Sequence, residues 1–396
     1  MPPSTQPAGQ PQRPPDEVTA RLAPVMDRVD RFWTRVTEGM HAGELWKQFL
    51  TDARSSYQLY SKDVDAERAA GVSKGKHLFQ LIGQFFWAIL EKLTPARRVL
   101  LLIALVLLLG PNGIWQTNSG DVRTVGLMAD AHFWSALLML ALLVMEVGDR
   151  VVMKRDLQIA KEIQTWLLPA NPPPIPGLEI AFATRPANTV AGDYYDVFPR
   201  GGADAQKFVL AMADVAGKSI PAALLMATIQ SSLKTLAAGQ ATLPELVSRM
   251  NHYACSNSQN GRRFTTAFIG EYDPATRTLV YVNAGHNAPV LRRKSGAIEN
   301  LEQGGIPLGI QGTAPYVAGS AVLQSGDWLI IFTDGVVEAE NNRAEEYGEQ
   351  RLLFVVHTGA ELRPGQLLRS IMEDLDRFVA GAPQHDDVTC MLVKAS

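Results

Sequence analysis

The chain has 396 residues and a formal net charge of −3, so it allows about two or three domains of ordinary size. No Lys/Arg stripe stands out, which excludes a basic nucleic-acid-binding surface as the main feature. The two cysteines, Cys255 and Cys390, lack CxxC spacing. This argues against a structural zinc site or a disulfide framework and favours a reducing compartment.

The first part of the chain carries weak folding signals. Residues 1–20 are rich in Pro, Gln and Ser, which predicts a disordered tail. No apolar segment typical of a signal peptide follows Met1. Residues 21–98 are expected to form a helical cytoplasmic region. Its apolar residues recur at helical spacing, which favours an amphipathic helix packed on a neighbour over a dedicated sensor.

Two uncharged runs, Val99–Gly120 and Ala131–Met145, lie within residues 99–147. A membrane span needs about 20 residues, so the first run qualifies and the second is marginal. Basic residues lie outside both ends of the pair, at Arg97, Arg98, Arg150, Lys154 and Arg155. This pattern predicts a two-helix transmembrane hairpin, hence a multi-pass protein of the cell inner membrane with a cytoplasmic catalytic domain. The alternative is a buried helical hairpin in a soluble domain.

Residues 148–170 are predicted to form a linker helix. Val152, Ile159, Ile163 and Trp166 follow one another at steps of seven, four and three, which is typical of a short coiled-coil seam. The seam allows a homodimer through the linker helix, but it could equally be a face that packs on the next domain. Prolines at 172–174 end the helix, so a separate domain is expected over 171–396.

This last domain alternates β-rich and helical segments. The predicted strands are Leu178–Thr184, Tyr194–Phe198, Lys207–Ala213, Thr265–Tyr272, Leu279–Asn283, Val290–Arg293, Trp328–Thr333 and Val388–Val393. The predicted helices are Ile220–Ala238, Leu243–Ser258, Glu349–Thr358 and Gly365–Ala380. Consecutive strands with pairs of helices between them indicate an α/β fold in which helices cover sheets.

Aspartates lie at the ends of several predicted strands. Asp193, Asp214 and Asp334 have a glycine close by, and Asp386 with Asp387 precedes the last strand. Together they predict a site for hard cations, because Mg²⁺, Mn²⁺ and Ca²⁺ prefer carboxylate oxygens. Two such ions could activate a water for phosphoester hydrolysis without a protein nucleophile. Any one of these aspartates alone is better explained as a turn residue.

Two further segments have simpler explanations. The AGKS sequence at 216–219 resembles the end of a P-loop, but Met212 stands where that motif requires glycine. We therefore reject the P-loop and place Lys218 at a helix start, pointing either toward the site or into solvent. His286, in a predicted turn, could bind phosphate or donate a proton, although a hydrogen-bonded turn histidine is the simpler interpretation.

Jointly, these segments resemble the metal-dependent Ser/Thr protein phosphatases of the PPM family, in the bacterial SpoIIE/RsbU-like branch. The matching segments follow the family's order over residues 160–396: IQTWLLP (163–169), AGDYYD (191–196), ADVAGKSIPAALLMA (213–227), NAGHNAP (283–289), GIPLG (305–309), FTDGVVEAEN (332–341) and HDDVT (385–389). Ala191 departs from the branch, which often has glycine there. Asp387 stands where the wider family often has Asn.

The resemblance implies an αββα sandwich, with two face-to-face β-sheets flanked by helices and a pair of Mn²⁺ or Mg²⁺ ions in the cleft between the sheets. Asp214 would bridge the ions with help from the carbonyl of Val215, and Asp334 and Asp386 would be the other main ligands. Asp193 would ligate directly or through water, and Asp387 would have a supporting role.

We therefore expect a membrane-anchored phosphatase that removes phosphate from Ser or Thr of a signalling protein. The resemblance implies that this substrate is an anti-sigma-factor antagonist. Two alternatives stay open. One is a non-catalytic signalling scaffold of the same fold, although such scaffolds usually lose a ligand. The other is a metal-dependent hydrolase of small phosphoesters, although the sequence contains no base-stacking or ribose-binding feature.

Overall fold

The computed structural model describes residues 87, 90, 93–110, 131–201, 206–217, 219–257 and 263–396. The predicted tail, most of the predicted region 21–98, and Lys218 lie outside the described residues. The chain divides into two compact units, Met1–Met145 and Glu146–Ser396.

Helix α4 (Pro95–Leu109) and the first part of helix α5 (Ala131–Leu167) belong to the first unit. Among the described residues, no helix is long and apolar enough to cross a membrane. The predicted hairpin over 99–147 is therefore not supported. Helix α4 has 15 residues, fewer than the ~20 that a span needs. The second apolar run continues, within α5, into charged sequence from Glu146 onward.

The second apolar run and the predicted linker are one continuous helix, α5, of 37 residues. The predicted seam lies on its exposed side, with side-chain exposures of 59% at Val152, 46% at Ile159, 48% at Ile163 and 79% at Trp166. This face therefore does not pack on the domain that follows, and the alternative that it does is wrong.

The second unit contains two β-sheets. One has the strand order β1 (Leu178–Arg185), β11 (Val388–Ala395), β10 (Trp328–Phe332), β6 (Val290–Arg292) and β7 (Ile298–Asn300). The other has the order β2 (Tyr194–Pro199), β3 (Phe208–Val215), β4 (Thr265–Asp273), β5 (Thr278–Ala284) and β8 (Gly304–Gly305), with β9 (Gly319–Val322) paired to β5. We call them the β10/β11 sheet and the β3/β4 sheet.

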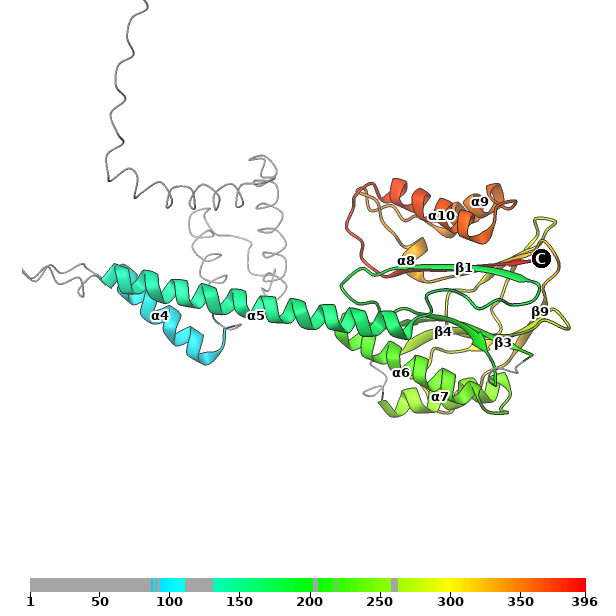
Figure 1. The fold of residues 1–396 in the computed structure, drawn as a ribbon, viewed down its shortest axis with the longest axis horizontal. Coiled ribbons are helices and arrows are strands. Elements are labelled where there is room, and N and C mark those ends of the chain that lie inside the picture. The colour runs from blue at the N-terminus through cyan, green and yellow to red at the C-terminus, as the bar shows by residue number, and fades with distance from the viewer. Residues whose placement is uncertain are drawn as a thin grey trace, which may run out of the picture. The chain divides into compact units, whose positions relative to one another are not determined.

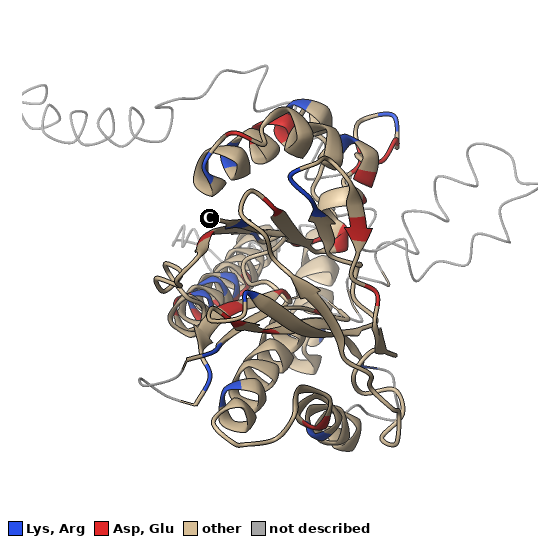
Figure 2. Cartoon of the chain, turned by 90° about the vertical axis from the view of Figure 1, so that its right-hand side faces the viewer, with Lys and Arg blue, Asp and Glu red and all other residues tan. Residues whose placement is uncertain are grey.

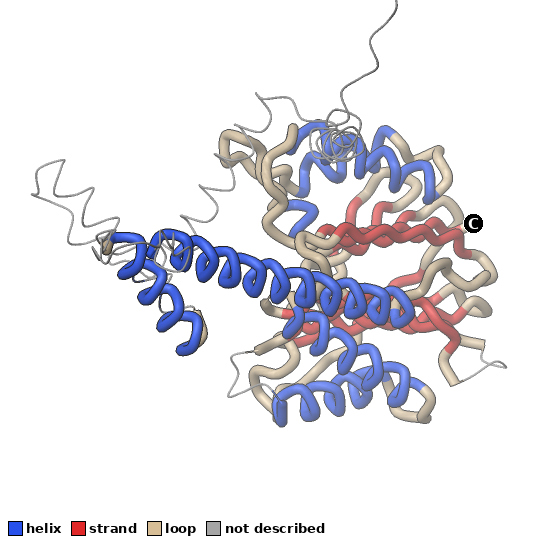
Figure 3. The backbone as a smooth tube through the Cα atoms, turned by 60° about the vertical axis from the view of Figure 1, so that its left-hand side comes forward, coloured by secondary structure: helices blue, strands red, loops and turns tan. Residues whose placement is uncertain are grey.

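Helices cover the outer face of each sheet (Figures 1 and 3). Helices α6 (Ile220–Ala237) and α7 (Leu243–Asn257) contact the β3/β4 sheet. Helix α10 (Pro364–Val379) contacts the β10/β11 sheet and packs against α9 (Glu349–Thr358). Figure 2 shows basic and acidic residues interspersed over the outer helices. The predicted αββα sandwich is thus confirmed.

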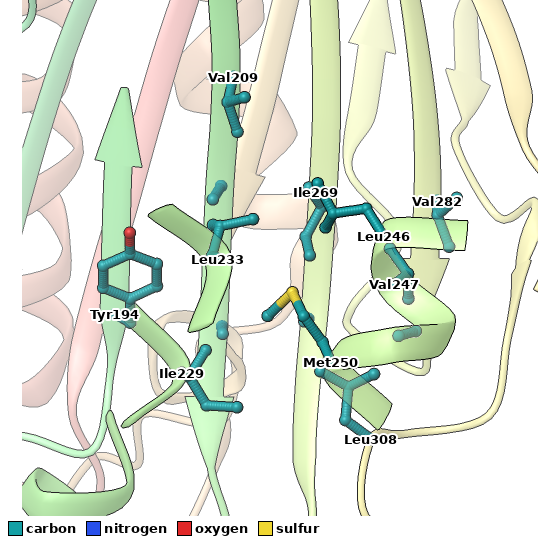
Figure 4. Close-up of a cluster of buried hydrophobic side chains, with 14 of the residues drawn as sticks. Tyr194, Val209, Ile229, Leu233, Leu246, Val247, Met250, Ile269, Val282 and Leu308 are labelled. Atoms are coloured by element: carbon teal, nitrogen blue, oxygen red, sulfur yellow. The ribbon is translucent and has the colours of Figure 1, made fainter. Parts of the chain in front are cut away.

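Alternation along the strands explains why the two sheets stack. Along β3, Val209 and Ala211 face a core beneath α6 and α7 (Figure 4), whereas Leu210 and Met212 face a second core between the sheets. Successive side chains of a strand point to opposite faces, so a strand that is apolar throughout must be covered on both sides. A third core, around Trp328, fills the space under α9 and α10.

The predicted strands and helices of this unit are all present, with ends displaced by a few residues. The short elements β7, β8, β9 and α8 (Asp334–Val337) were not predicted. They contain two to four residues each, which is too short for a hydrophobic period to show.

Candidate active site

Strand pairing brings the candidate aspartates to one edge of the sandwich. Asp193 immediately precedes β2 and Asp214 lies at the end of β3, and these two strands run antiparallel with Tyr194 opposite Ala213. In the other sheet, Asp334 follows β10 and Asp386 precedes β11, again on antiparallel neighbours. Helix α8 begins at Asp334 itself.

Asp193 joins the two sheets. It is 2% exposed, and its Oδ2 accepts hydrogen bonds from the hydroxyls of Thr333 (3.0 Å) and Thr389. Thr333 follows β10 and Thr389 lies in β11. The carboxylate at the start of one sheet is therefore held by hydroxyls of the other.

Asp387 adds a second link between the same segments. Its carboxylate accepts the backbone N–H of Ala187 at 2.7 Å and that of Gly192 at 2.6 Å. The backbone N–H of Asp387 in turn donates to Asp386 Oδ1 at 2.9 Å. Asp387 is therefore a hydrogen-bond acceptor for the loop before β2.

The carboxylates are close enough to repel one another. Burial raises the pKa of Asp193 well above its usual range, and the Asp214 charge raises it further. Burial also raises the pKa of Asp214 to about 7, with contributions from the charges of Asp334 and Asp386. Neighbouring anions removed from water favour a protonated carboxyl or a bound cation.

Close backbone approach explains two of the glycines. A Cβ at Gly192 would lie 3.1 Å from the carbonyl oxygen of Val215, so the loop before Asp193 lies against the end of β3. A Cβ at Gly335 would lie 2.0 Å from the carbonyl oxygen of Asp387. Gly217 adopts φ +117°, a left-handed conformation that favours glycine.

The donor set fits a hard divalent cation. The converging side chains are all carboxylates, joined by the carbonyl of Val215, and such oxygens suit Mg²⁺ or Mn²⁺. Among the described residues, no three acidic, histidine or cysteine side chains are gathered tightly enough to hold an ion as they stand.

The side chain of His286 is buried. It is 7% exposed, its Nδ1 lies 3.1 Å from the hydroxyl of Thr266, and its backbone N–H donates to Asn283 Oδ1 at 2.7 Å. Burial lowers its pKa to about 4, so the ring is neutral at ordinary pH. This supports the interpretation as a hydrogen-bonded turn residue.

A cavity of about 160 Å³ opens beside Asp386. Arg185, Glu338 and Glu340 are among its lining residues, which places both glutamates at the rim of the candidate site. A larger hollow of about 780 Å³, beside Arg200 and Lys207, contains none of the candidate aspartates. The smaller, acidic cavity therefore borders the candidate site at Asp386, while Asp193, Asp214 and Asp334 are not among the residues that line it.

Several residues of the site were not predicted. Thr333 precedes Asp334, and Thr389 follows Asp387 by two residues, which puts it on the same face of its strand. The short spacing of these two threonines from the aspartates was the sequence signal that could have identified them as site residues. Gln164, in the IQTWLLP segment, forms hydrogen bonds with Ala191, and its sequence contained no local signal for this contact.

The comparisons with known proteins agree with this fold and site. The second unit has the fold of the PP2C phosphatases. It resembles the SiaA-PP2C domain of Pseudomonas aeruginosa, with a TM-score of 0.54 and 17% identity over 63% of this chain and 99% of that one. It also resembles the RsbU and RsbW domains of Rv1364c from Mycobacterium tuberculosis, with a TM-score of 0.50 and 24% identity over 58% and 63% of the two chains. At these identities the likeness establishes the fold alone.

Sequence comparison indicates which kind of PP2C phosphatase the chain is similar to. Residues 204–396 match the family model described as Stage II sporulation protein E (SpoIIE), so this part of the chain is similar to a SpoIIE-type PP2C/PPM phosphatase domain. It is 26% identical to Protein IcfG of Synechocystis over 70% of this chain and 47% of that protein. It is 28% identical to phosphoserine phosphatase RsbU of Bacillus subtilis over 62% and 72% of the two chains. The chain thus spans about half the length of the first of these relatives.

Proposed function

We propose that the chain is a Mn²⁺- or Mg²⁺-dependent phosphatase that hydrolyses phosphoserine or phosphothreonine on a signalling protein. The observation that supports this is the edge where Asp193 and Asp214 of one sheet face Asp334 and Asp386 of the other. Burial and the repulsion between these carboxylates together raise the pKa of Asp214, and bound cations would offset both. Turn residues without a ligand have no need for such an arrangement.

Each residue has a role in this proposal. Two bound ions would supply positive charge for the phosphate oxygens and would lower the pKa of an attacking water. Asp214 and the carbonyl of Val215 would hold them from the β3/β4 sheet, and Asp334 and Asp386 from the β10/β11 sheet. Asp193, held by Thr333 and Thr389, would ligate directly or orient a coordinated water.

The substrate is proposed from the relatives. RsbU and RsbP of Bacillus subtilis are both described as phosphoserine phosphatases. We propose that this chain likewise acts on a phosphorylated protein, and that the protein is an anti-sigma-factor antagonist.

The test is hydrolysis of p-nitrophenyl phosphate and of a phosphothreonine peptide by the full chain, with EDTA, Mg²⁺ or Mn²⁺. Asp334→Asn is the test variant. Asp273→Asn is the matched control, because Asp273 ends β4 on the side opposite Thr265, which pairs with Val215. We expect metal-dependent activity that is lost in the first variant and kept in the second. Full activity in Asp334→Asn, or activity in EDTA, would contradict the proposed mechanism.

Two further measurements separate the alternatives. A scaffold would show no Mn²⁺ uptake by calorimetry, whereas a phosphatase would. A hydrolase of small phosphoesters would prefer nucleotides to the phosphopeptide.

A further inference from the structure

Helix α5 reaches the candidate active site through one buried side chain. Gln164, in the last turn of the helix, is 7% exposed. Its Nε2 donates to the carbonyl oxygen of Ala191 at 2.7 Å, and its Oε1 accepts the backbone N–H of Ala191 at 3.0 Å. The side-chain amide thus pairs with both main-chain groups of Ala191, as a neighbouring strand would.

The loop that receives this contact carries Asp193. Residues 186–193 connect β1 to β2 and adopt no helix or strand. The backbone N–H groups of Ala187 and Gly192 donate to Asp387, and the main chain of Ala191 pairs with Gln164. The loop forms no β-ladder with a neighbouring strand, so hydrogen bonds from side chains of other elements hold its main chain.

We propose that Gln164 is a positioning residue of the candidate active site: its amide pairs with the main chain of Ala191 and sets the place of Asp193. The role rests on the proposed function of the aspartate edge. Groups that hold the residues around a metal site typically affect metal affinity or activity about 10–100-fold when they are removed.

A hydrogen bond that only holds the end of α5 in place would differ from those of Gln164. The end of α5 already has one, because Gln230 Nε2 on α6 donates to the carbonyl oxygen of Leu167 at 3.2 Å. That contact satisfies a carbonyl that the helix leaves open at its C-terminus. The hydrogen bonds of Gln164 instead satisfy groups of the loop, two residues before Asp193. Gln230 and Gln164 can therefore be tested separately.

The experiment uses the full chain and four proteins. Gln164→Met removes both hydrogen bonds and keeps the length of the side chain, so the protein is expected to fold. Gln230→Ala loosens the end of α5 without touching the loop. Gln158→Ala makes a glutamine substitution at an exposed position of the same helix. The unsubstituted chain is the reference. The readouts are Mn²⁺ affinity by calorimetry, and hydrogen exchange at the Ala191 and Gly192 amides without added metal.

We expect Gln164→Met to weaken Mn²⁺ binding about 10–100-fold and to speed exchange at both amides. We expect the other two variants to stay within about twofold of the reference, well inside the range of such effects. Mn²⁺ affinity and exchange in Gln164→Met that match the reference would overturn the proposal. If the reference takes up no Mn²⁺, the proposed function fails, while the exchange measurement still decides whether Gln164 orders the loop.

Discussion

The carboxylate of Asp387 accepts the backbone N–H of Gly192 at 2.6 Å. It thereby joins the residue after Asp386 to the residue before Asp193, from two segments 195 residues apart in the sequence. The two halves of the candidate site, one from each sheet, are thus connected by a hydrogen bond that involves none of the four proposed catalytic aspartates.

Asp387→Ala tests this link. The substitution leaves the N–H groups of Ala187 and Gly192 without their acceptor. An unsatisfied buried donor costs about 1–3 kcal/mol, which applies to the buried Gly192 and to a lesser extent to the half-buried Ala187. We expect lower stability in urea denaturation and a reduced metal-dependent phosphatase rate. Asp387→Asn keeps one acceptor oxygen, so its stability and its phosphatase rate should lie between those of the unsubstituted chain and those of the Ala variant. An Asn variant as impaired as the Ala variant would show that charge, rather than hydrogen bonding, is what matters.

Gly335→Ala tests the close approach of two backbones. Its Cβ would lie 2.0 Å from the carbonyl oxygen of Asp387, so Asp334 must move. Overpacking of this kind costs about 1–3 kcal/mol, and we expect phosphatase activity to fall with it. Gly365→Ala, in α10, meets nothing within 4 Å and should stabilise the protein by up to about 1 kcal/mol, since alanine favours helix. Thermal melts should show a lower Tm for Gly335→Ala and a higher Tm for Gly365→Ala than for the unsubstituted chain.

The effect of Asp214→Asn on stability should be opposite with and without bound metal. Burial and neighbouring charges raise the pKa of Asp214 to about 7, so its ionised form destabilises the fold above its unfolded pKa. Without metal at pH 8, the variant should be more stable by on the order of 1–3 kcal/mol. With Mn²⁺ at 100 times its Kd, the unsubstituted chain should gain about 2.7 kcal/mol and the variant little. Calorimetric melts with EDTA or Mn²⁺ measure both, and an equal Mn²⁺ gain would rule Asp214 out as a ligand.

Asp374 lies in α10, away from the candidate site, and we expect Asp374→Asn to lower the stability of the protein in a pH-dependent way. Asp374 accepts hydrogen bonds from Arg351 Nε (2.8 Å) and from the hydroxyl of Tyr347 (3.0 Å), and Arg351 is the main cause that lowers its pKa. The ionised form is therefore the stabilising one. The variant should lose roughly 1–2 kcal/mol at pH 7, less than a buried pair because Arg351 is 40% exposed.

Since the folded pKa of Asp374 is depressed, that difference should be complete above pH ~4, the unfolded value. It should shrink as the pH falls further, through the folded pKa. Urea denaturation of both proteins at several pH values checks this. A constant difference would mean that the contribution is not ionic.

The local pattern of the sequence was enough to predict sheets covered by helices and the strand ends that carry the aspartates, whereas the two-sheet sandwich was implied by the family resemblance. An apolar strand such as β3 reports burial on both faces through its composition, and aspartates at strand ends report which loops carry the chemistry. The membrane hairpin predicted over residues 99–147 is not shown by the structure, which leaves residues 111–130 undescribed. Hydropathy located the second apolar run, and the structure places that run in α5, which continues into charged sequence.

The tertiary structure alone decided which distant groups hold the site. Thr389 is 196 residues from Asp193, and Gln164 is 27 residues from Ala191. Hydrophobic periodicity reports whether a side chain is buried, but a hydrogen bond between two elements depends on where each lies in space. The sequence by itself determined which carboxylates could meet, and the packing of the two sheets decided what keeps them in place.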